Sequence, residues 1–421
     1  MTKFFDFLRN PFVAAAVLCS VLFYTKLIPL KNDSPYFAAI PIEDVFSISG
    51  TVDSNPVKSS SGTCYTVSLR LSSVSTEKKE DCLSSAGGII SVRIPSSLVE
   101  AVYPGRLYSL GTGALLVEAG EKIYCTGKWS KKYNAFIADT ALYRGHTPGF
   151  FGHISHIRAK SRLIFKRLLF SWSSAGGLVL SLLSGSREYL ENGVGDSFRN
   201  AGLSHILALS GMHLSFFAGL AGGAGKTLGG KKIRMFAQLA GILFFVWFAG
   251  LSPSLFRALI CSLLAIISRF VFCRKTDTFE ILCAAFLLHS VLRPGDLFSA
   301  AFLLSYGALA GILLLGDSVS RVLAKSLPPS LSSPLSASFA AQSATCPISI
   351  SLFGSFTPIG IVSTVFVSPV VSLFLTLSVI FIILSLAIPF LSPAFGVIMN
   401  KLYKLIVSLV SVFARVPPVQ I

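Results

Sequence analysis

The stretch from Phe198 to Ser215 reads FRNAGLSHILALSGMHLS. Its second half begins a long apolar segment, and we predict a membrane crossing over about His205–Gly222. This crossing carries two imidazoles, His205 and His213, with Ser210 between them. Ionisable groups are costly in hydrocarbon and normally face the interior of a helix bundle or a water-filled path. The stretch therefore predicts a bundle of membrane helices with a polar path, although two neutral, hydrogen-bonded structural histidines give the same pattern.

The composition of the whole chain agrees with a membrane protein. Of the 421 residues, 52% are hydrophobic and 13% are charged, whereas soluble domains carry about 25% charged residues. A fully water-solvated surface is therefore excluded, and 35 Phe offer too much apolar area for a disordered chain. The net charge of +17 is typical of cytoplasmic loops and headgroup contacts, or of a nucleic-acid path. Membrane topology alone is the simpler explanation of this charge.

Further apolar stretches predict a polytopic α-helical membrane protein. A first anchor covers about Phe12–Leu30, and Leu178–Leu183 is too short to span and is predicted to be re-entrant. The remaining predicted crossings are Ile233–Gly250, Leu255–Phe272, Phe279–Leu292, Leu297–Leu315, Ser336–Phe353, Ile359–Ile388 and Phe395–Phe413.

The loops between these crossings differ in charge. Uncharged or nearly neutral loops, such as Ser252–Ser254 and Gly354–Pro358, alternate with basic ones. The basic loops hold Lys226, Lys231, Lys232, Arg234, Arg269, Arg274, Lys275, Arg321 and Lys325. By the positive-inside rule the basic loops are cytoplasmic, so the polar segment before the bundle lies outside.

That polar segment, residues 40–150, alternates apolar and polar residues over five or six short stretches, with turn residues between them. We predict a small extracytoplasmic β barrel, for which the OB fold is one option. Outside the cytoplasm Cys64 can pair with Cys82, and Cys125 is an equally open partner. The predicted domains are thus the anchor 1–39, the β domain 40–150, a basic amphipathic helix 151–173 on the membrane surface, and the bundle 174–421.

Several residues of the β domain suit a single-stranded nucleic acid, which is gripped by cations and by aromatic rings that stack on bases. They are Arg70 and Arg93 in predicted strands, and Lys128, Trp129, Lys131, Lys132 and Tyr133 in one short segment. A solvated hairpin tip is an equally simple explanation of that segment. The net charge from Val45 to Phe150 is only +3, so the domain is not a strong electrostatic trap.

The other motifs in the sequence say less about function. Small residues recur every four positions at Gly211, Ser215, Gly219 and Gly223, which predicts close helix packing. The stretch Gly222–Thr227 resembles a phosphate loop but lacks its first Gly and a preceding strand. No metal site, cofactor or catalytic residue is predicted, since the His, Cys and acidic residues lack ligand spacing.

Five blocks, in this order, resemble the ComEC-type competence proteins, which are DNA-import channels of natural transformation. They read LLSGSR (182–187), AGLSHILALSGMH (201–213), SLFRA (254–258), FLLSY (302–306) and AQSATCP (341–347). The resemblance covers roughly Ser174–Ile388. The block at 301–306 departs from the family pattern because it lacks the usual Gly and Gln.

The resemblance implies that the chain passes single-stranded DNA across the cytoplasmic membrane. The family's characteristic residues fall on Gly202, His205, Ser210, Gly211, His213, Arg257, Ser305 and Gln342. Membrane lipids and a separate DNA receptor, nuclease and cytoplasmic ATPase are the implied partners. The nuclease is expected on another protein because the His-x-His-x-Asp-His pattern of a metallo-β-lactamase-like domain is absent from the sequence.

Two other functions remain open from the residues alone. The stretch Ala208–Gly211 resembles an intramembrane serine protease motif, with Ser210 as nucleophile and His289 as a base on another helix. A small-solute transporter would also use a polar path through the bundle.

Overall fold

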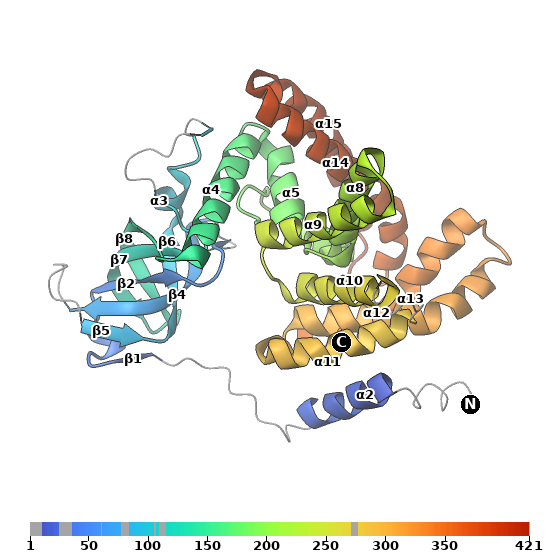
Figure 1. Cartoon of the computed structure of the whole chain (residues 1–421), viewed down its shortest axis with the longest axis horizontal. Coiled ribbons are helices and arrows are strands. Elements are labelled where there is room, and N and C mark those ends of the chain that lie inside the picture. Colours follow the sequence, from blue (N-terminus) through green and yellow to red (C-terminus); the bar gives the residue numbers. More distant parts are fainter. Residues whose placement is uncertain are drawn as a thin grey trace.

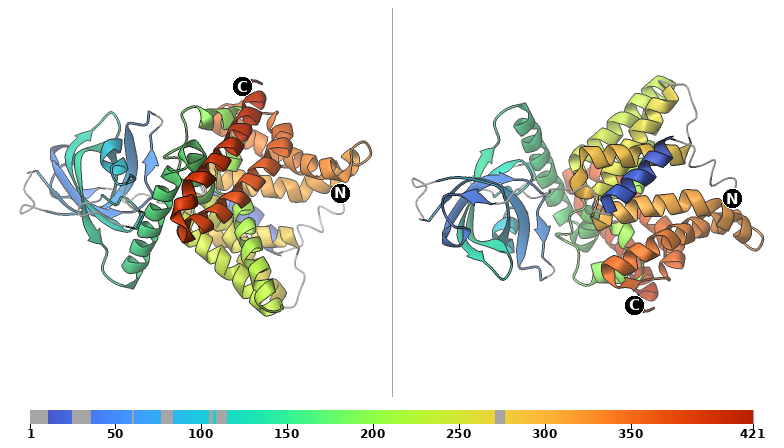
Figure 2. Two further views of the ribbon diagram at one scale, coloured as in Figure 1. Left: turned by 90° about the horizontal axis from the view of Figure 1, so that it is seen from above. Right: turned by 90° about the horizontal axis from the view of Figure 1, so that it is seen from below.

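The computed structural model describes residues 11–24, 36–59, 61–76, 84–104, 107–108, 115–270 and 277–420. A β domain and a helical bundle lie side by side, and helix α4 (Phe150–Phe170) lies between them (Figures 1 and 2). The predicted fold class, a helical membrane protein with a small β domain before the bundle, is confirmed.

The β domain is a ring of strands. Around the ring, β2 (Ser47–Val52) pairs with β4 (Cys64–Ser75), β4 with β6 (Ile89–Pro95), β6 with β8 (Ala135–His146), β8 with β7 (Glu121–Ser130), and β7 with β2. Only the β6–β8 contact in this ring is parallel. The short helix α3 (Ser96–Glu100) follows β6. This strand order and the Greek-key path are those of the OB-type barrel.

The alternating pattern of the sequence fills the barrel. On β4, Tyr65, Val67 and Leu69 are buried, while their neighbours point outward. Gly127 lies at a register shift between β7 and β8, where a Cβ would collide with the carbonyl oxygen of Ile137. Glycine is therefore required for the ring to close at this point. Three short strands extend the sheet: β1 (Phe37–Ala38), β3 (Val57–Lys58) and β5 (Ser84–Gly87).

The bundle is built from helices of unequal length. Within the described residues, four are long and apolar enough to cross a membrane: α9 (Lys231–Ala249), α12 (Ala300–Leu323), α14 (Gly360–Ala387) and the segment Pro389–Phe413 that contains α15 (Ser392–Phe413). The other helices are α2 (Pro11–Tyr24), α5 (Ser173–Ser184), α6 (Val194–Asn200), α7 (Ser204–Leu207), α8 (Gly211–Leu228), α10 (Pro253–Phe270), α11 (Thr278–Leu292) and α13 (Pro329–Phe353). The predicted re-entrant stretch lies in α5, which is a buried core helix against α14 and α15.

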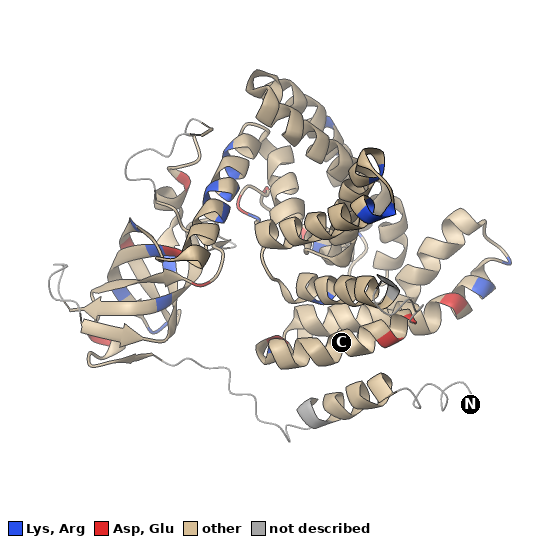
Figure 3. Ribbon diagram, in the orientation of Figure 1, with Lys and Arg blue, Asp and Glu red and all other residues tan. Residues whose placement is uncertain are grey.

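The basic turns lie away from the β domain. Figure 3 shows Lys and Arg at the α8–α9 and α12–α13 turns, at the far end of these helices. The opposite helix ends gather near the β domain: Gly250, which ends α9, lies against Asn55 and Arg158. Arg293, which ends α11, donates to the carbonyl oxygen of Leu251 over 2.8 Å. This separation of charge is the one that the positive-inside rule predicts.

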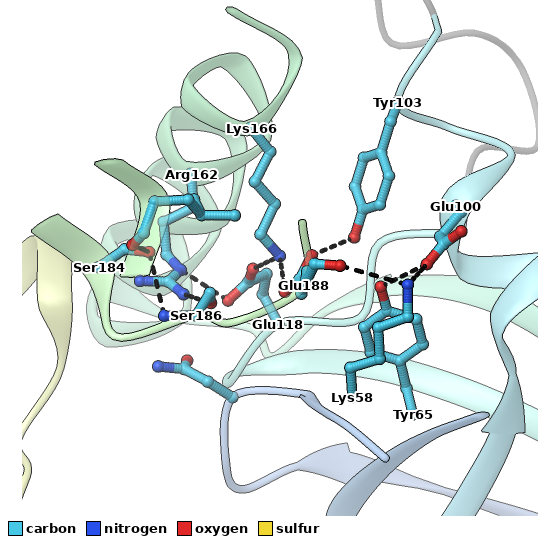
Figure 4. Close-up of polar contacts among 12 residues, drawn as sticks. Lys58, Tyr65, Glu100, Tyr103, Glu118, Arg162, Lys166, Ser184, Ser186 and Glu188 are labelled. Atoms are coloured by element: carbon cyan, nitrogen blue, oxygen red, sulfur yellow. Dashed lines mark hydrogen bonds and ion pairs between the residues drawn. The ribbon is translucent and has the colours of Figure 1, made fainter. Parts of the chain in front are cut away.

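Helix α4 joins the two parts of the molecule. Its Leu163 packs into the core of the β domain, and its Leu168 and Leu169 pack into the core of the bundle. The sequence predicts that this basic helix lies on the membrane surface, but three of its cations lie in the protein interior. Arg162 and Lys166 are buried at the junction (Figure 4). Arg167 is also buried, and its Nε donates to the carbonyl oxygen of Val102 over 2.9 Å.

Carboxylates from outside the helix neutralise Arg162 and Lys166. Glu118, in the segment before β7, accepts from Arg162 over 2.9 Å and from Lys166 over 2.7 Å. Lys166 also lies 2.8 Å from Glu188, which follows α5 and accepts from Tyr103 over 2.6 Å. The network thus ties the β domain, α4 and the bundle together, because each charge is balanced by a partner on a different element.

The neighbouring charges in this network shift the pKa values of Glu118 and Lys166. Burial raises the pKa of Glu118, but the positive charges of Arg162 and Lys166 outweigh burial and hold this pKa at about 2. Burial lowers the pKa of Lys166, and the negative charges of Glu118 and Glu188 reverse that effect, so this pKa is raised. Glu118 and Lys166 are therefore charged at neutral pH.

Substitution Glu118→Ala is expected to lower the free energy of unfolding by about 3–5 kcal/mol, because it leaves Arg162 and Lys166 buried with one acid fewer. The matched control is Asp53→Ala, since Asp53 pairs with an Arg70 side chain that is 63% exposed and such surface pairs contribute at most about 1 kcal/mol. Thermal unfolding of the purified protein in detergent measures both, and equal losses would contradict the assignment.

Acid is expected to weaken the same junction. The pKa of Glu118 is about 2 in the folded protein and 4.5 ordinarily. Its ionised form therefore stabilises the fold above pH 4.5, and this contribution is lost as the pH falls from 4.5 towards 2. In Glu118→Gln the melting temperature is expected to fall less steeply over this interval than in the unmodified protein. Parallel profiles in the two proteins would contradict the prediction.

Candidate functional site

The predicted crossing that begins at His205 is wrong at its start, because the chain leaves the helical conformation inside this stretch. Helix α7 ends at Leu207, and α8 begins at Gly211. Between them Ala208 has ψ 139° and Ser210 has ψ 170°, so the backbone is extended. His205 and His213 thus lie on different helices, and the prediction that one continuous helix carries both imidazoles is wrong.

The imidazole of His213 caps the break. Its Nδ1 lies 3.3 Å from the backbone nitrogen and 3.1 Å from the Oγ of Ser210. This reciprocal contact between the residue before a helix and the third residue within it satisfies polar groups that the break exposes. The imidazole is fully buried, and its Nε2 has no hydrogen-bond partner among the described residues. His205, by contrast, is exposed.

Arg257 of α10 lies beside the start of α8. Its guanidinium Nη2 is 3.6 Å from the point that a Cβ on Gly211 would occupy. Its Nη1 donates to the carbonyl oxygen of Ser305 over 2.5 Å, and the group lies 5.9 Å from the ring centre of Tyr306. The Nε is buried and lacks a partner in the described part of the chain. The structure thus brings five predicted residues together, namely Ser210, Gly211, His213, Arg257 and Ser305.

Gly202 and Gln342 form a second group. Gly202 has φ +72°, and a Cβ there would lie 2.6 Å from the Cα of Gly360 at the start of α14. Gln342 of α13 closes on the same point, since its Nε2 would lie 2.4 Å from a Cβ on Gly360. Within the described residues, its Oε1 is buried without a partner. Gly360 belongs to this group although the sequence analysis did not single it out.

His289 does not act on Ser210 in this structure. Its Nε2 lies 3.1 Å from Asp296, and its Nδ1 lies 3.3 Å from the hydroxyl of Tyr306. Asp296 also pairs with Arg293 at 3.4 Å. These contacts form a network behind Arg257 that the sequence analysis missed. The spacing of His289 and Asp296 across the end of α11 was the available signal.

The small-residue stripe of α8 is not the packing surface that was predicted. Nothing lies within 4 Å of a Cβ placed on Gly219 or Gly223. Close packing against α9 instead uses the neighbouring Gly222 and Gly225, which meet Gln238 and Ala237. A close contact of this kind also joins α12 to α13, because a Cβ on Gly311 would lie 2.5 Å from the carbonyl oxygen of Ala340.

Three of the nucleic-acid candidates of the β domain, Arg93, Lys132 and Tyr133, lie together. Arg93 of β6 stacks on Tyr133, with its guanidinium 4.1 Å from the ring centre, and Lys132 lies 5.5 Å from the same ring. Tyr133 and Lys132 occupy the β7–β8 turn, so the segment is a hairpin tip. Strands two and three of an OB barrel and its last hairpin loop are the usual oligonucleotide surface, and here they correspond to β4, β6 and this turn.

The remaining candidates of this domain are placed differently. Arg70 donates to Asp53 over 2.7 Å and Lys131 pairs with Glu43 over 3.0 Å, so both have acidic partners. Lys128 is exposed, whereas Trp129 packs against the barrel core. Arg93 combines a stacked aromatic ring with a neighbouring cation, and this group is therefore the strongest of the set.

The cysteines of the β domain are separated. Cys125 lies in the barrel core, where burial raises the pKa of its thiol to about 12. Cys64 lies at the start of β4, and its Sγ accepts from Arg93 over 3.1 Å. Neither forms a disulfide with another cysteine among the described residues. Cys82 lies outside the described residues, so its pairing with Cys64 stays a prediction.

Two further expectations concern bound groups. No set of three His, Cys, Asp or Glu side chains among the described residues is placed to hold a metal ion. The stretch Gly222–Thr227, which resembles a phosphate loop, is helical and forms the end of α8.

Substitution Gly202→Ala is expected to lower the free energy of unfolding by more than about 2 kcal/mol, since it adds a clash to a left-handed backbone. The matched control is Gly219→Ala, where a Cβ meets open space and the change from Gly favours the helix by up to about 1 kcal/mol. Thermal unfolding in detergent separates the two. A Gly202→Ala protein as stable as the control would show that this close contact is absent.

Comparison with known proteins matches residues 182–421, more than half of the chain, to the family described as "Competence protein". The chain is 28% identical over 157 residues to ComE operon protein 3 of Bacillus subtilis (strain 168). That alignment covers 36% of this chain and 19% of the relative. No solved structure matches. The matched region contains the break between α7 and α8 and the polar groups around it, and the chain is a multi-pass protein of the cytoplasmic membrane that belongs to the Competence protein family.

Proposed function

We propose that this protein passes single-stranded DNA across the cytoplasmic membrane during natural transformation. The observation that carries the proposal is the position of Arg257 beside the broken crossing at Ser210–Gly211. Family membership supports the substrate, and this cationic group inside the bundle supplies a reason for an anion to enter.

The electrostatics of this group favour a passing phosphate. The N-terminus of α8 presents the positive end of the dipole of an 18-residue helix. The guanidinium of Arg257 lies near the same point, so two positive groups face each other without a carboxylate between them in the described contacts. A phosphodiester at this position would relieve their repulsion.

The groups left without partners have the same implication. Buried polar atoms normally have hydrogen-bond partners, and an orphaned one costs about 1–3 kcal/mol. His213 Nε2, Arg257 Nε and Gln342 Oε1 are orphaned within the described residues, and all three lie on predicted path residues. Water or a hydrated strand in the path would satisfy them. We therefore assign Gly202, His205, Ser210, Gly211, His213, Arg257, Ser305 and Gln342 to the path.

The β domain would guide the strand to this path. Arg93, Lys132 and Tyr133 offer a base-stacking ring with cations around it. The buried network at the junction fixes the domain against the bundle and keeps this surface at a constant distance from the path. A DNA receptor, a nuclease and a cytoplasmic ATPase on other proteins complete the proposed process.

A serine hydrolase is a second candidate, because Ser210 Oγ and His213 Nδ1 lie 3.1 Å apart. In the described contacts, however, no carboxylate orients His213, whose Nε2 is unpartnered. A fluorophosphonate probe tests this function. Labelling of the purified protein that disappears in Ser210→Ala would establish it, and absence of labelling would exclude it for this class of probe.

Substitution Arg257→Gln is expected to lower transformation by about 100-fold, because a loss of roughly 2.7 kcal/mol in the interaction with a passing phosphate corresponds to two factors of ten. The matched control is Arg234→Gln, at an exposed position near the α8–α9 turn. Transformation frequency is scored together with the amount of protein in the membrane. Normal import by Arg257→Gln at normal membrane levels would contradict the proposal.

Substitution Tyr133→Ala is expected to weaken binding of a single-stranded oligonucleotide to the full-length protein by about 5- to 100-fold, the loss of one stacked base at roughly 1–3 kcal/mol. Tyr36→Ala is a control, since this Tyr packs near the barrel core and bonds to Ile40 instead. Fluorescence anisotropy at two salt concentrations measures the affinity. Equal affinities for the two variants would remove the hairpin tip from the binding surface.

A further inference from the structure

A polar cavity lies at the end of the bundle where α6, the α13–α14 connection and the C-terminal strand meet. Its volume is about 500 Å³, within the range of small-molecule sites. The cavity is lined by Asp196, Arg199 and Asn200 of α6, by Phe353, Gly354, Ser355 and Thr357, and by Pro418 and Gln420. None of these residues belongs to the path assigned above.

The two charges of the cavity are not used by the fold. Asp196 and Arg199 lie three positions apart on α6, a spacing that permits an ion pair. Among the described residues, however, neither side chain forms an ion pair or a hydrogen bond, and both are exposed. A cation and an anion that line one cavity without pairing are both available to a ligand.

The rest of the lining suits a flat, hydrogen-bonding group. Phe353, which ends α13, is 50% exposed and offers a ring face. Asn200 and Gln420 contribute amides, and Ser355 and Thr357 contribute hydroxyls. The wall is held by pairing of β10 (Val419–Gln420) with β9 (Ser355–Phe356).

The cavity adjoins the assigned path. The carbonyl oxygen of Thr357 lies 3.3 Å from the point that a Cβ on Gly202 would occupy. Gly202 in turn touches Gly360, on which Gln342 closes. The connection that lines the cavity is one of the uncharged loops, on the same side of the membrane as the β domain by the charge pattern.

We propose that this cavity binds one nucleotide of a single strand at the outer entrance of the path. Arg199 binds its phosphodiester, Phe353 stacks on its base, and Asn200 or Asp196 accepts from a base amino group. The assignment rests on the proposed function for its substrate class. With one cation and one anion in the lining, the cavity selects a base and a phosphate together and does not concentrate anions in general.

The test is equilibrium binding of a mixed-sequence 12-nucleotide DNA to the full-length protein in phosphatidylcholine nanodiscs. Arg199→Gln and Phe353→Ala are each expected to weaken binding about fivefold or more. Loss of one phosphate contact is also expected to reduce the slope of log affinity against log salt by about 0.7 in Arg199→Gln. The matched control Arg187→Gln removes the same charge from an exposed position in the preceding loop, and is expected to bind normally.

Photocrosslinking provides a second measurement that does not depend on other DNA contacts. An oligonucleotide with 4-thiothymidine is expected to crosslink to the peptide that contains Phe353, and this crosslink is expected to disappear in Arg199→Gln. Normal affinity and normal crosslinking in Arg199→Gln would overturn the assignment.

A lipid occupant would also overturn it. In that case short-chain phosphatidylethanolamine would bind the unmodified protein but not Arg199→Gln, and the two proteins would bind DNA with equal affinity. Because these assays measure binding at equilibrium, they leave the import defect of Arg257→Gln as a separate test of the proposed function.

Discussion

Inside a membrane, a backbone that leaves the helical conformation must have its polar groups satisfied by protein, because lipid offers no hydrogen bonds. The break between α7 and α8 meets this requirement with its own residues. Ser210 and His213 cap the new helix start, and the buried imidazole is held by that contact. The polar character of this part of the bundle follows from the break, since the cap, the helix end and Arg257 all meet there.

The two glycines on either side of the break have different tasks. Gly202 allows a left-handed backbone turn, so the chain before α7 makes a close contact with the start of α14. At Gly211 a Cβ would lie in ordinary contact with the Arg257 guanidinium, 3.6 Å from its Nη2. A side chain is therefore excluded at Gly202, whereas Gly211 marks the point where Arg257 lies beside the first turn of α8.

The sequence predicted the parts of the fold that depend on local pattern. Alternation identified the barrel, apolar length identified the long helices, and loop charge placed the β domain opposite the basic turns. Prediction from the sequence failed where the position of a side chain depends on residues that are distant in the sequence. The cations of α4 suggested lipid headgroups because Glu118 and Glu188, which neutralise them, lie 48 residues before and 22 residues after Lys166. The break was missed because Ala208–Gly211 does not interrupt the apolar segment. Only the contact between Ser210 and His213 marks the start of the new helix. The grouping of Arg257 with Ser210 required the tertiary structure, since the resemblance named these residues without placing them together.

The buried charges of the junction constrain how the protein is made. Glu118 precedes Arg162 by 44 residues, and β8, the last strand of the barrel, ends only 16 residues before Arg162. The cations of α4 are therefore synthesised directly after the barrel is complete. Until the barrel has folded, Arg162 and Lys166 lack the carboxylate of Glu118 that neutralises them. Docking of α4 between the two parts of the molecule is thus coupled to folding of the β domain.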